Sequence, residues 1–211
     1  HTHRDHSPAA AALAQRTGAP MVGWRPRFPE GQDASFVPRE EPADGERIAL
    51  GPQTHLRVIH TPGHASNHLC FLLEEESMLF CGDHLMQGST VVINPPDGDM
   101  SAYLASLQGL LALPLRWLAP GHGFLVADPH TVIRQLVAHR LRREDKVRRT
   151  LQAQGAGTLA TLVPRVYDDV AAGLHGMATR SLLAHLLKLQ VDGQARCEGD
   201  PQTGTWRLVA G

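Results

Sequence analysis

The chain has 211 residues, a formal net charge of −1 and a hydrophobic content of 42%, which is ordinary for a globular protein long enough to bury a core. No apolar run approaches the ~18 residues that cross a bilayer, so we expect no membrane partner. The three cysteines are an odd number without framework spacing. This fits a reducing, cytoplasmic compartment better than a disulfide-stapled secreted domain.

The small net charge hides an asymmetry between the two ends of the chain. Residues 1–130 carry 8 basic and 14 acidic side chains, whereas residues 131–211 carry 12 and 7. A contrast of this kind predicts two units with different partners. We place the domain boundary near Arg149, with residues 1–149 in the first domain and residues 150–211 in the second.

The first half of the chain predicts a helix, a long loop and a block of strands. Ser7 and Pro8 form an N-cap followed by proline at the first helical position, and Gly18 ends the predicted helix. A short strand-like stretch follows at residues 21–24, and residues 25–46 form a polar loop rich in Pro and Gly. Turn residues then separate four predicted strands, at 47–50, 54–60, 68–75 and 77–83.

Helices dominate the second half. Asp99 can cap an amphipathic helix over 100–113, and a short strand over 116–120 leads into Gly121-His122-Gly123. Asp128 and Pro129 repeat the start signal, here for a long charged helix reaching about Gln154. The rest predicts a helix over 158–170 bent or split at Pro164, a helix over 177–193, and a hairpin of strands 194–199 and 205–210. This order is the outline of a winged helix-turn-helix.

Histidine and aspartate gather at a few loop positions. The chain opens with H-x-H-x-D-H, in which His1 and His3 can point one way, as at the end of a strand, while Asp5 and His6 lie where the chain turns into the helix. Neutral imidazoles and carboxylates suit zinc, and also iron or manganese. Two cations in one pocket need about six or seven protein ligands. Further candidates follow predicted strands at glycine-containing corners: His64 in TPGH, Asp83 in CGD and His122 in PGHG.

Taken in this order, HTHRDH, TPGH, CGD and PGHG resemble the metallo-β-lactamase superfamily. The charged helix and the winged-helix outline of the tail are similar to its lactamase-β-2-like branch. The resemblance implies an α/β fold. Residues 1–149 would form part of a catalytic αββα sandwich with the metals at one edge, and residues 150–211 a small winged-helix-like α+β domain. Because the superfamily places the first sheet before H-x-H-x-D-H, we expect this chain to be a fragment that lacks those upstream strands.

The resemblance also implies a role for each candidate ligand. His1, His3 and His64 would hold a first metal, Asp5, His6 and His122 a second, and Asp83 would bridge both. Two divalent ions, zinc first and iron or manganese as alternatives, would lower the pKa of a bridging water, and the hydroxide would attack phosphorus or a carbonyl carbon. Asp5 would orient that hydroxide or accept its proton, so Asp5 and Asp83 are the expected catalytic residues.

Several residues near the motifs match no ligand position. We expect His68 to pack or to support a ligand, and His84, directly after Asp83, to face solvent. His60 has no expected role. Cys70 and Cys81 lie in apolar strand contexts and are expected to be core thiols.

Three functions remain open on the sequence. Animal members of the lactamase-β-2-like branch are described as zinc-dependent endoribonucleases. This resemblance, with the basic second half, points to a ribonuclease or phosphodiesterase acting on single-stranded RNA. The second reading is a thioesterase or small-ester hydrolase of the glyoxalase II type. The third is a nucleic-acid-binding module without metal, against which the intact ligand set argues. Hydrolysis of β-lactams is the least expected.

The distribution of positive charge should separate the first two readings. A basic track into the metal cleft would favour RNA, whereas an acidic or apolar pocket would favour a small ester. The charged stretch 139–149 could bind phosphates by counter-ion release or form a solvated helix face. Arg180 and Lys188 could contact a nucleic-acid backbone. A winged helix can equally dock another protein or a second copy of the chain, so a homodimer stays open as an alternative.

Overall fold

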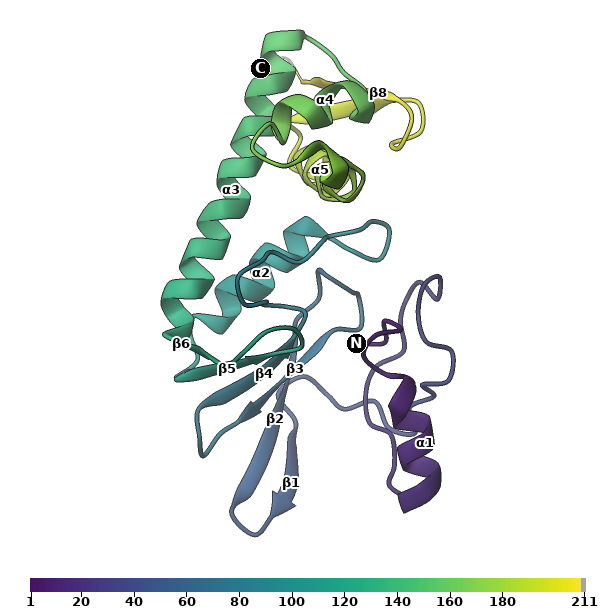
Figure 1. Cartoon of the computed structure of the whole chain (residues 1–211), viewed down its shortest axis with the longest axis vertical. Helices are drawn as coiled ribbons and strands as arrows, with labels where there is room; N and C mark the ends of the chain where they lie inside the picture. Colours follow the sequence, from purple (N-terminus) through teal and green to yellow (C-terminus); the bar gives the residue numbers. More distant parts are fainter. Residues whose placement is uncertain (210–211) are drawn as a thin grey trace.

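The structure, a computed structural model, describes residues 1–209 and shows a sheet-based unit joined to a small helical unit by one long helix (Figure 1). The strands of the sheet are β1 (Arg47–Gly51), β2 (Thr54–His60), β3 (Leu69–Leu73), β4 (Met78–Gly82), β5 (Trp117–Pro120) and β6 (Val126–Ala127). The helices of this part are α1 (Pro8–Thr17), α2 (Met100–Leu110) and α3 (Pro129–Gln154). No helix in the described part of the chain is long and apolar enough to cross a membrane.

Strand direction brings three chain segments to one edge of the sheet. The spatial order is β1-β2-β3-β4-β5-β6, and every neighbouring pair is antiparallel except β4 and β5. Strands β2, β4 and β5 therefore run the same way and end at the same edge. The loops that follow these three strands carry His64, Asp83 and His122.

Helices α2 and α3 cover one face of the sheet and bury the main core. Side chains alternate between the faces of a strand, so Leu72, Leu79 and Leu118 pack under the helices while Phe80 and Trp117 point the other way. On that second face Phe80 is 43% and Trp117 38% exposed. Residues 1–209 contain no second large sheet, so they supply one half of the expected sandwich.

The C-terminal unit has the predicted helix-helix-hairpin order. Its elements are α4 (Leu159–Val166), the 3₁₀ turn η1 (Ala172–Leu174), α5 (His175–Val191), β7 (Ala195–Glu198) and β8 (Thr205–Leu208). Trp206 of the hairpin is fully buried, and its backbone pairs with Gly157. Helix α3 joins the units, since Ile133 lies in the first core and Val147 and Leu151 lie in the second. The boundary at Arg149 falls inside this helix and stays a prediction.

Two local expectations are wrong, and one short strand was not expected. The stretch 21–24 forms one isolated bridge, Val22 to Glu40, because it faces an irregular loop instead of a strand. The two-residue strand β6 had no pattern that could predict it. Helix α4 runs through Pro164 and ends at Val166, not at 170, because the backbone of Tyr167 leaves the helical region (φ −116°, ψ 39°).

The charged stretch of α3 is largely neutralised by acids of its own unit. Arg143 is buried and donates to both carboxylate oxygens of Asp169 at 2.7 and 2.8 Å, and to the carbonyl oxygen of Val166 at 2.5 Å. Lys146 pairs with Asp168. Further along the helix, Asp145 takes Arg148 at 2.6 Å and Arg149 at 2.5 Å. Lys188 of α5, a candidate for nucleic-acid contact, also pairs with acids, Glu144 at 2.9 Å and Asp192 at 2.6 Å.

Replacing Arg143→Met should lower the free energy of unfolding by about 2–3 kcal/mol, because the buried carbonyl of Val166 loses its donor. Urea denaturation followed by circular dichroism measures the change. Arg148→Met is the matched control, and removing its exposed ion pair should cost no more than about 0.5 kcal/mol. Equal losses in the two variants would contradict a structural role for the buried guanidinium.

Candidate metal centre

The seven predicted ligands converge at one edge of the sheet. Three of them follow β2, β4 and β5, and the segment from His1 to His6 lies against the same edge. No strand holds this segment. It is held by an isolated bridge between His3 and Gln32 and by the Asp33 N–H, which donates to the carbonyl oxygen of Thr2 at 2.7 Å. The expectation that His1 and His3 lie at a strand end therefore stays a prediction, while both residues reach the predicted edge of the sheet.

His1, His3 and His64 form the first group, with ligand atoms within 4.8 Å of one another. His64 Nδ1 lies 2.8 Å from the carbonyl oxygen of Val92, which can only accept, so this nitrogen carries the proton. The lone pair on His64 Nε2 then points at His3 Nδ1, 3.0 Å away. Burial lowers the pKa of His64 to about 4, which keeps the ring neutral near pH 7. Two neutral imidazoles with facing nitrogens suit a shared cation.

Asp5, His6 and His122 form the second group, again with ligand atoms within 4.8 Å of one another. The Nε2 atom of His122 lies 3.3 Å from Asp5 Oδ2, and that of His6 lies 3.6 Å from the same oxygen. The Asp5 side chain is 62% exposed, whereas that of His6 is only 16% exposed. The second group is therefore the solvent-facing side of the centre.

Asp83 lies between the two groups and touches both. Its Oδ2 atom is 3.7 Å from His64 Nε2 and 3.2 Å from His6 Nε2, and its Oδ1 atom is 3.6 Å from His122 Nε2. The residue is buried. Each oxygen of this carboxylate therefore faces a different part of the histidine cluster.

The donor atoms fit divalent cations. His1 Nε2, His6 Nε2 and Asp83 Oδ1 are buried and have no hydrogen-bond partner among the described residues. Buried polar atoms without a partner are costly, and a carboxylate among neutral imidazoles is more so. Nitrogen and carboxylate oxygen are the ligands that zinc, iron and manganese accept, so the set is suited to hold them.

Gly121 leaves the space in which this centre fits. A Cβ atom at this position would lie 2.8 Å from His6 Cε1 and 2.9 Å from Asp83 Oδ1. Any side chain here would therefore push against one residue of the second group and against the carboxylate between the groups.

Two buried histidines beside the motifs, His68 and His84, pack next to the metal centre. His68 is buried, and its Nδ1 atom lies 2.9 Å from Thr61 Oγ1 while its ring stacks on that of His1 at 5.0 Å. Burial lowers the pKa of His68 well below its ordinary value. The expectation that His84 faces solvent is wrong, because α2 places Tyr103 against its ring at 5.0 Å and buries it completely. Cys70 and Cys81 are buried as predicted.

A buried polar network holds the opening segment in place, and no sequence motif predicts it. Thr2 Oγ1 donates to Gln32 Oε1 at 2.8 Å and accepts from Asn67 Nδ2 at 2.9 Å. Gln32 Nε2 donates to Asp97 Oδ2 at 3.0 Å. Only Thr2 could have been noticed from the sequence, because it lies between two predicted ligands in the opening motif. The other members are separated from it by 30 or more residues and belong to no motif.

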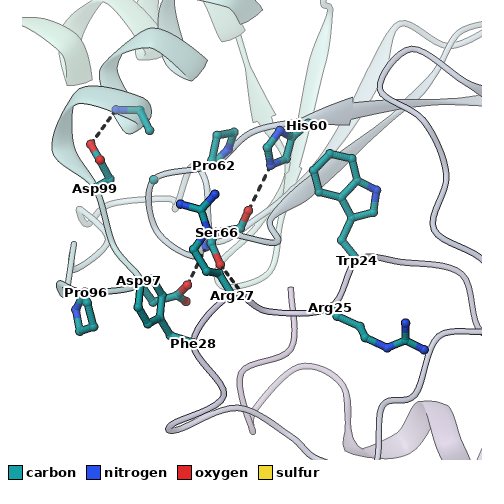
Figure 2. Close-up of a pocket in the computed structure, with 12 residues that line it drawn as sticks. Trp24, Arg25, Arg27, Phe28, His60, Pro62, Ser66, Pro96, Asp97 and Asp99 are labelled. Atoms are coloured by element: carbon teal, nitrogen blue, oxygen red, sulfur yellow. Dashed lines mark hydrogen bonds between the residues drawn. The ribbon is translucent and has the colours of Figure 1, made fainter.

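A cavity of about 450 Å³ adjoins the loop that carries His64 (Figure 2). Trp24 and Phe28 contribute aromatic walls, and Ser66 N–H donates to Asp97 Oδ1 at 3.1 Å. None of the seven predicted ligands lines it. Through Asp97 the cavity wall and the network around Thr2 form one connected structure.

Two family models match the chain. The model of the metallo-beta-lactamase superfamily matches residues 1–122, and that of the beta-lactamase associated winged helix domain matches residues 158–206. The chain belongs to the metallo-β-lactamase superfamily. Its C-terminal unit is a winged-helix domain, so the fold expected from the motifs is confirmed.

Curated relatives of this superfamily member include fungal and animal proteins. Lactamase-like protein notP of Aspergillus sp. is 30% identical over 77% of this chain and 54% of its own length. The beta-lactamase-like protein 2 homolog of Drosophila melanogaster is 30% identical over 78% and 58%. The atrochrysone carboxyl ACP thioesterase of Aspergillus fumigatus is 29% identical over 69% and 50%. The chain spans about half the length of the curated relatives it matches.

Solved structures show the same fold. The metallo-beta-lactamase family protein TTHA1429 from Thermus thermophilus matches with a TM-score of 0.70 and 28% identity, over 82% of this chain and 55% of that one. The protein TTHA1623, solved in a di-iron-bound form, matches with a TM-score of 0.52 and 29% identity, over 60% and 69%.

Replacing Gly121→Ala should weaken metal binding by at least about tenfold, because the new methyl group displaces His6 or Asp83. Metal content after dialysis against a weak chelator, measured by inductively coupled plasma mass spectrometry, tests this. Gly109→Ala is the control, since a Cβ atom there meets nothing within 4 Å. Unchanged metal content in Gly121→Ala would show that the space beside this glycine is not needed.

Replacing Thr2→Val should also reduce metal content, because Gln32 and Asn67 lose their buried partner and the opening segment loses its position. Thr2→Ser keeps the hydroxyl and should restore most of the binding. Thr150→Val, which removes a hydroxyl bonded within α3, serves as the control for the same substitution elsewhere. If Thr2→Val and Thr2→Ser bind metal equally, the network does not position the ligands.

Proposed function

We propose that the protein is a dinuclear metal-dependent hydrolase that cleaves thioesters or related small esters. The observation that carries this proposal is the place of Asp83, buried between two histidine groups whose inward atoms lack partners. The superfamily consists mostly of hydrolases. The dinuclear mechanism and the substrate class are the parts that we add.

The two groups would each hold one cation. His1, His3 and His64 would bind the first, Asp5, His6 and His122 the second, and Asp83 both. Zinc is the first choice, and the di-iron form of TTHA1623 makes iron a real alternative. When bound, the cations would supply Lewis-acid polarisation of the scissile group and a lower pKa for water at neutral pH.

The chain's own residues divide the remaining tasks. Asp5 is the exposed carboxylate of the second group, so it can accept a proton from an incoming water and pass it to solvent. The Val92 carbonyl fixes the ring of His64 in one tautomer. Asp83 supplies negative charge that keeps the histidine cluster attractive to cations. Buried Tyr103 and His84 close the side of the centre under α2 against water.

The distribution of charge on α3 and the names of the relatives both favour an ester substrate over an RNA substrate. Most cationic side chains in the charged stretch of α3 form ion pairs with Asp145, Asp168 or Asp169. This stretch therefore presents no continuous basic track toward the metal centre. Nucleic-acid affinity depends on several cations that are free to meet phosphates. A relative that covers 69% of this chain is named as a thioesterase, and thioester cleavage is chemistry that the proposed centre could perform.

The second candidate is a nuclease acting on single-stranded RNA. The winged-helix domain supports it, because folds of this type often present a helix to nucleic acid. Its α5 carries Arg180 with no ion pair among residues 1–209. The predicted homodimer and the predicted cytoplasmic location are separate proposals, the latter supported by three free cysteines.

A single substrate panel tests the proposal. Metal-loaded protein is given an acyl thioester, single-stranded RNA and a chromogenic cephalosporin, with and without chelator. We expect thioester turnover that falls at least about 100-fold with chelator or in Asp83→Ala, since both remove a main source of charge stabilisation. Asp145→Ala on α3 is the control and should keep full activity.

Each outcome of the panel decides between the candidates. RNA cleavage with the same dependence on chelator and Asp83 would replace the ester proposal with the second candidate. Thioester turnover that survives both chelator and Asp83→Ala would contradict the metal mechanism itself.

A further inference from the structure

A groove of about 540 Å³ lies between α3 and the loop of residues 86–90. Its helical wall is formed by side chains spaced three or four apart, which share one face of α3: Val132, Gln135, Leu136, His139 and Arg142. The loop that forms the other wall begins three residues after Asp83. The groove therefore starts close to the metal centre along the chain.

One end of the groove is bonded to the loop of His122. Gln87 N–H points at the carbonyl oxygen of His122 at 3.5 Å, and Gln87 Oε1 accepts from Phe124 N–H at 3.2 Å. The two loops pack closely here, because a Cβ atom on Gly123 would lie 2.7 Å from Gln87 Cβ. A molecule in this end of the groove would lie beside a residue of the second ligand group.

The opposite end of the groove is cationic. Arg140 donates to the carbonyl oxygen of Val91 at 2.5 Å and so pins the end of the loop to α3. Arg142, on the groove face, is exposed and has no ion pair or hydrogen bond within residues 1–209. Arg143 and Lys146 beside it are paired with Asp169 and Asp168. Arg142 thus differs from its neighbours in having no acidic partner.

Between the ends, apolar side chains line the groove together with the polar side chains of Ser89, Thr90 and Gln135. Four half-buried apolar side chains pack against the main core and also face the groove: Met86, Val126, Val132 and Leu136. Next to His122, Phe124 is 79% and Leu125 56% exposed, so apolar surface continues toward the metal centre. Val132 and Arg142 are ten residues apart on one helix, which corresponds to about 15 Å.

We propose that this groove binds an extended apolar chain of the substrate that ends in an anion, either a carboxylate or a phosphate, held by Arg142. The assignment rests on the proposed ester or thioester hydrolysis and names the substrate class. Apolar walls match a hydrocarbon-rich chain, and one free guanidinium matches one terminal anion. A single unpaired guanidinium in this groove does not match the repeated phosphates of RNA.

Binding of decanoate and decan-1-ol by isothermal titration calorimetry tests the groove without turnover. Zinc-loaded protein is titrated in acetate buffer, so that a carboxylate without a chain competes at the metals in every experiment. We expect decanoate to bind with one-to-one stoichiometry, and about tenfold more weakly to Arg142→Gln, while the binding of decan-1-ol stays the same in both proteins. Gln135→Glu, an exposed isosteric change on the groove face, should also weaken only decanoate.

Arg134→Gln is the matched control, because Arg134 is an exposed cation of α3 outside the groove. It should bind decanoate like the unchanged protein. Equal affinity of Arg142→Gln and unchanged protein for decanoate would overturn the proposal. Displacement of decanoate by single-stranded RNA, with loss of RNA binding in Arg142→Gln, would overturn it in favour of a nucleic-acid surface.

Thioester kinetics then identify the source of the anion. One pair of substrates differs by a carboxylate at the end of an octanoyl chain, and another by a phosphate on the pantetheine arm. In Arg142→Gln we expect KM to rise about tenfold for the anionic member of one pair, with kcat unchanged, and the affected pair names the source. If the panel shows thioester turnover and neither pair responds, the groove assignment fails while the proposed function stands.

Discussion

The candidate metal centre holds imidazole and carboxylate groups close together, and three of their buried atoms, His1 Nε2, His6 Nε2 and Asp83 Oδ1, have no hydrogen-bond partner among residues 1–209. The centre at the edge of the sheet holds four histidines and one aspartate that are wholly or partly buried, with Asp5 and His122 on the solvent side. Such a cluster is unstable by itself, since buried polar atoms lose their hydration and gain nothing in return. Its members can remain together only because each backbone is fixed by structure outside the cluster. A cation would then complete an arrangement that the fold has already prepared.

The backbone positions of the ligands are fixed differently in the loops of the sheet and in the opening segment. Strands β2, β4 and β5 run in one direction and carry three ligands in the loops that follow them. Within residues 1–209, the opening segment is held by the hydroxyl of Thr2 and by side chains from distant loops. Close packing adds the last constraint. At Gly63, where φ is +137°, a Cβ atom would lie 2.3 Å from the Cα atom of Tyr103, so α2 presses directly on the loop of His64.

Local patterns and long-range contacts differ in how well the sequence predicts them. The strands and helix starts were predictable because turn residues, proline and capping aspartates act within a few positions; Asp99 does accept a hydrogen bond from Ala102 N–H. The seven ligands were predictable because their spacing forms motifs. The network around Thr2 was not, since its partners lie 30 and 65 residues away. The burial of His84 depends on α2, and the pairing of Arg143 depends on Asp169, 26 residues further on.

Helix α5 belongs to the winged-helix domain, yet its side chains also reach into the sheet-based unit. Ala184 is part of the main core, and the Ser181 hydroxyl accepts a hydrogen bond from Ile93 N–H at 3.4 Å, directly after the loop that bonds to His64. The C-terminal domain is therefore not a detachable appendage. A protein shortened at Arg149 would lose Ala184 from the main core and the Ser181 hydroxyl beside Val92, so we expect the candidate metal centre and the C-terminal domain to unfold together.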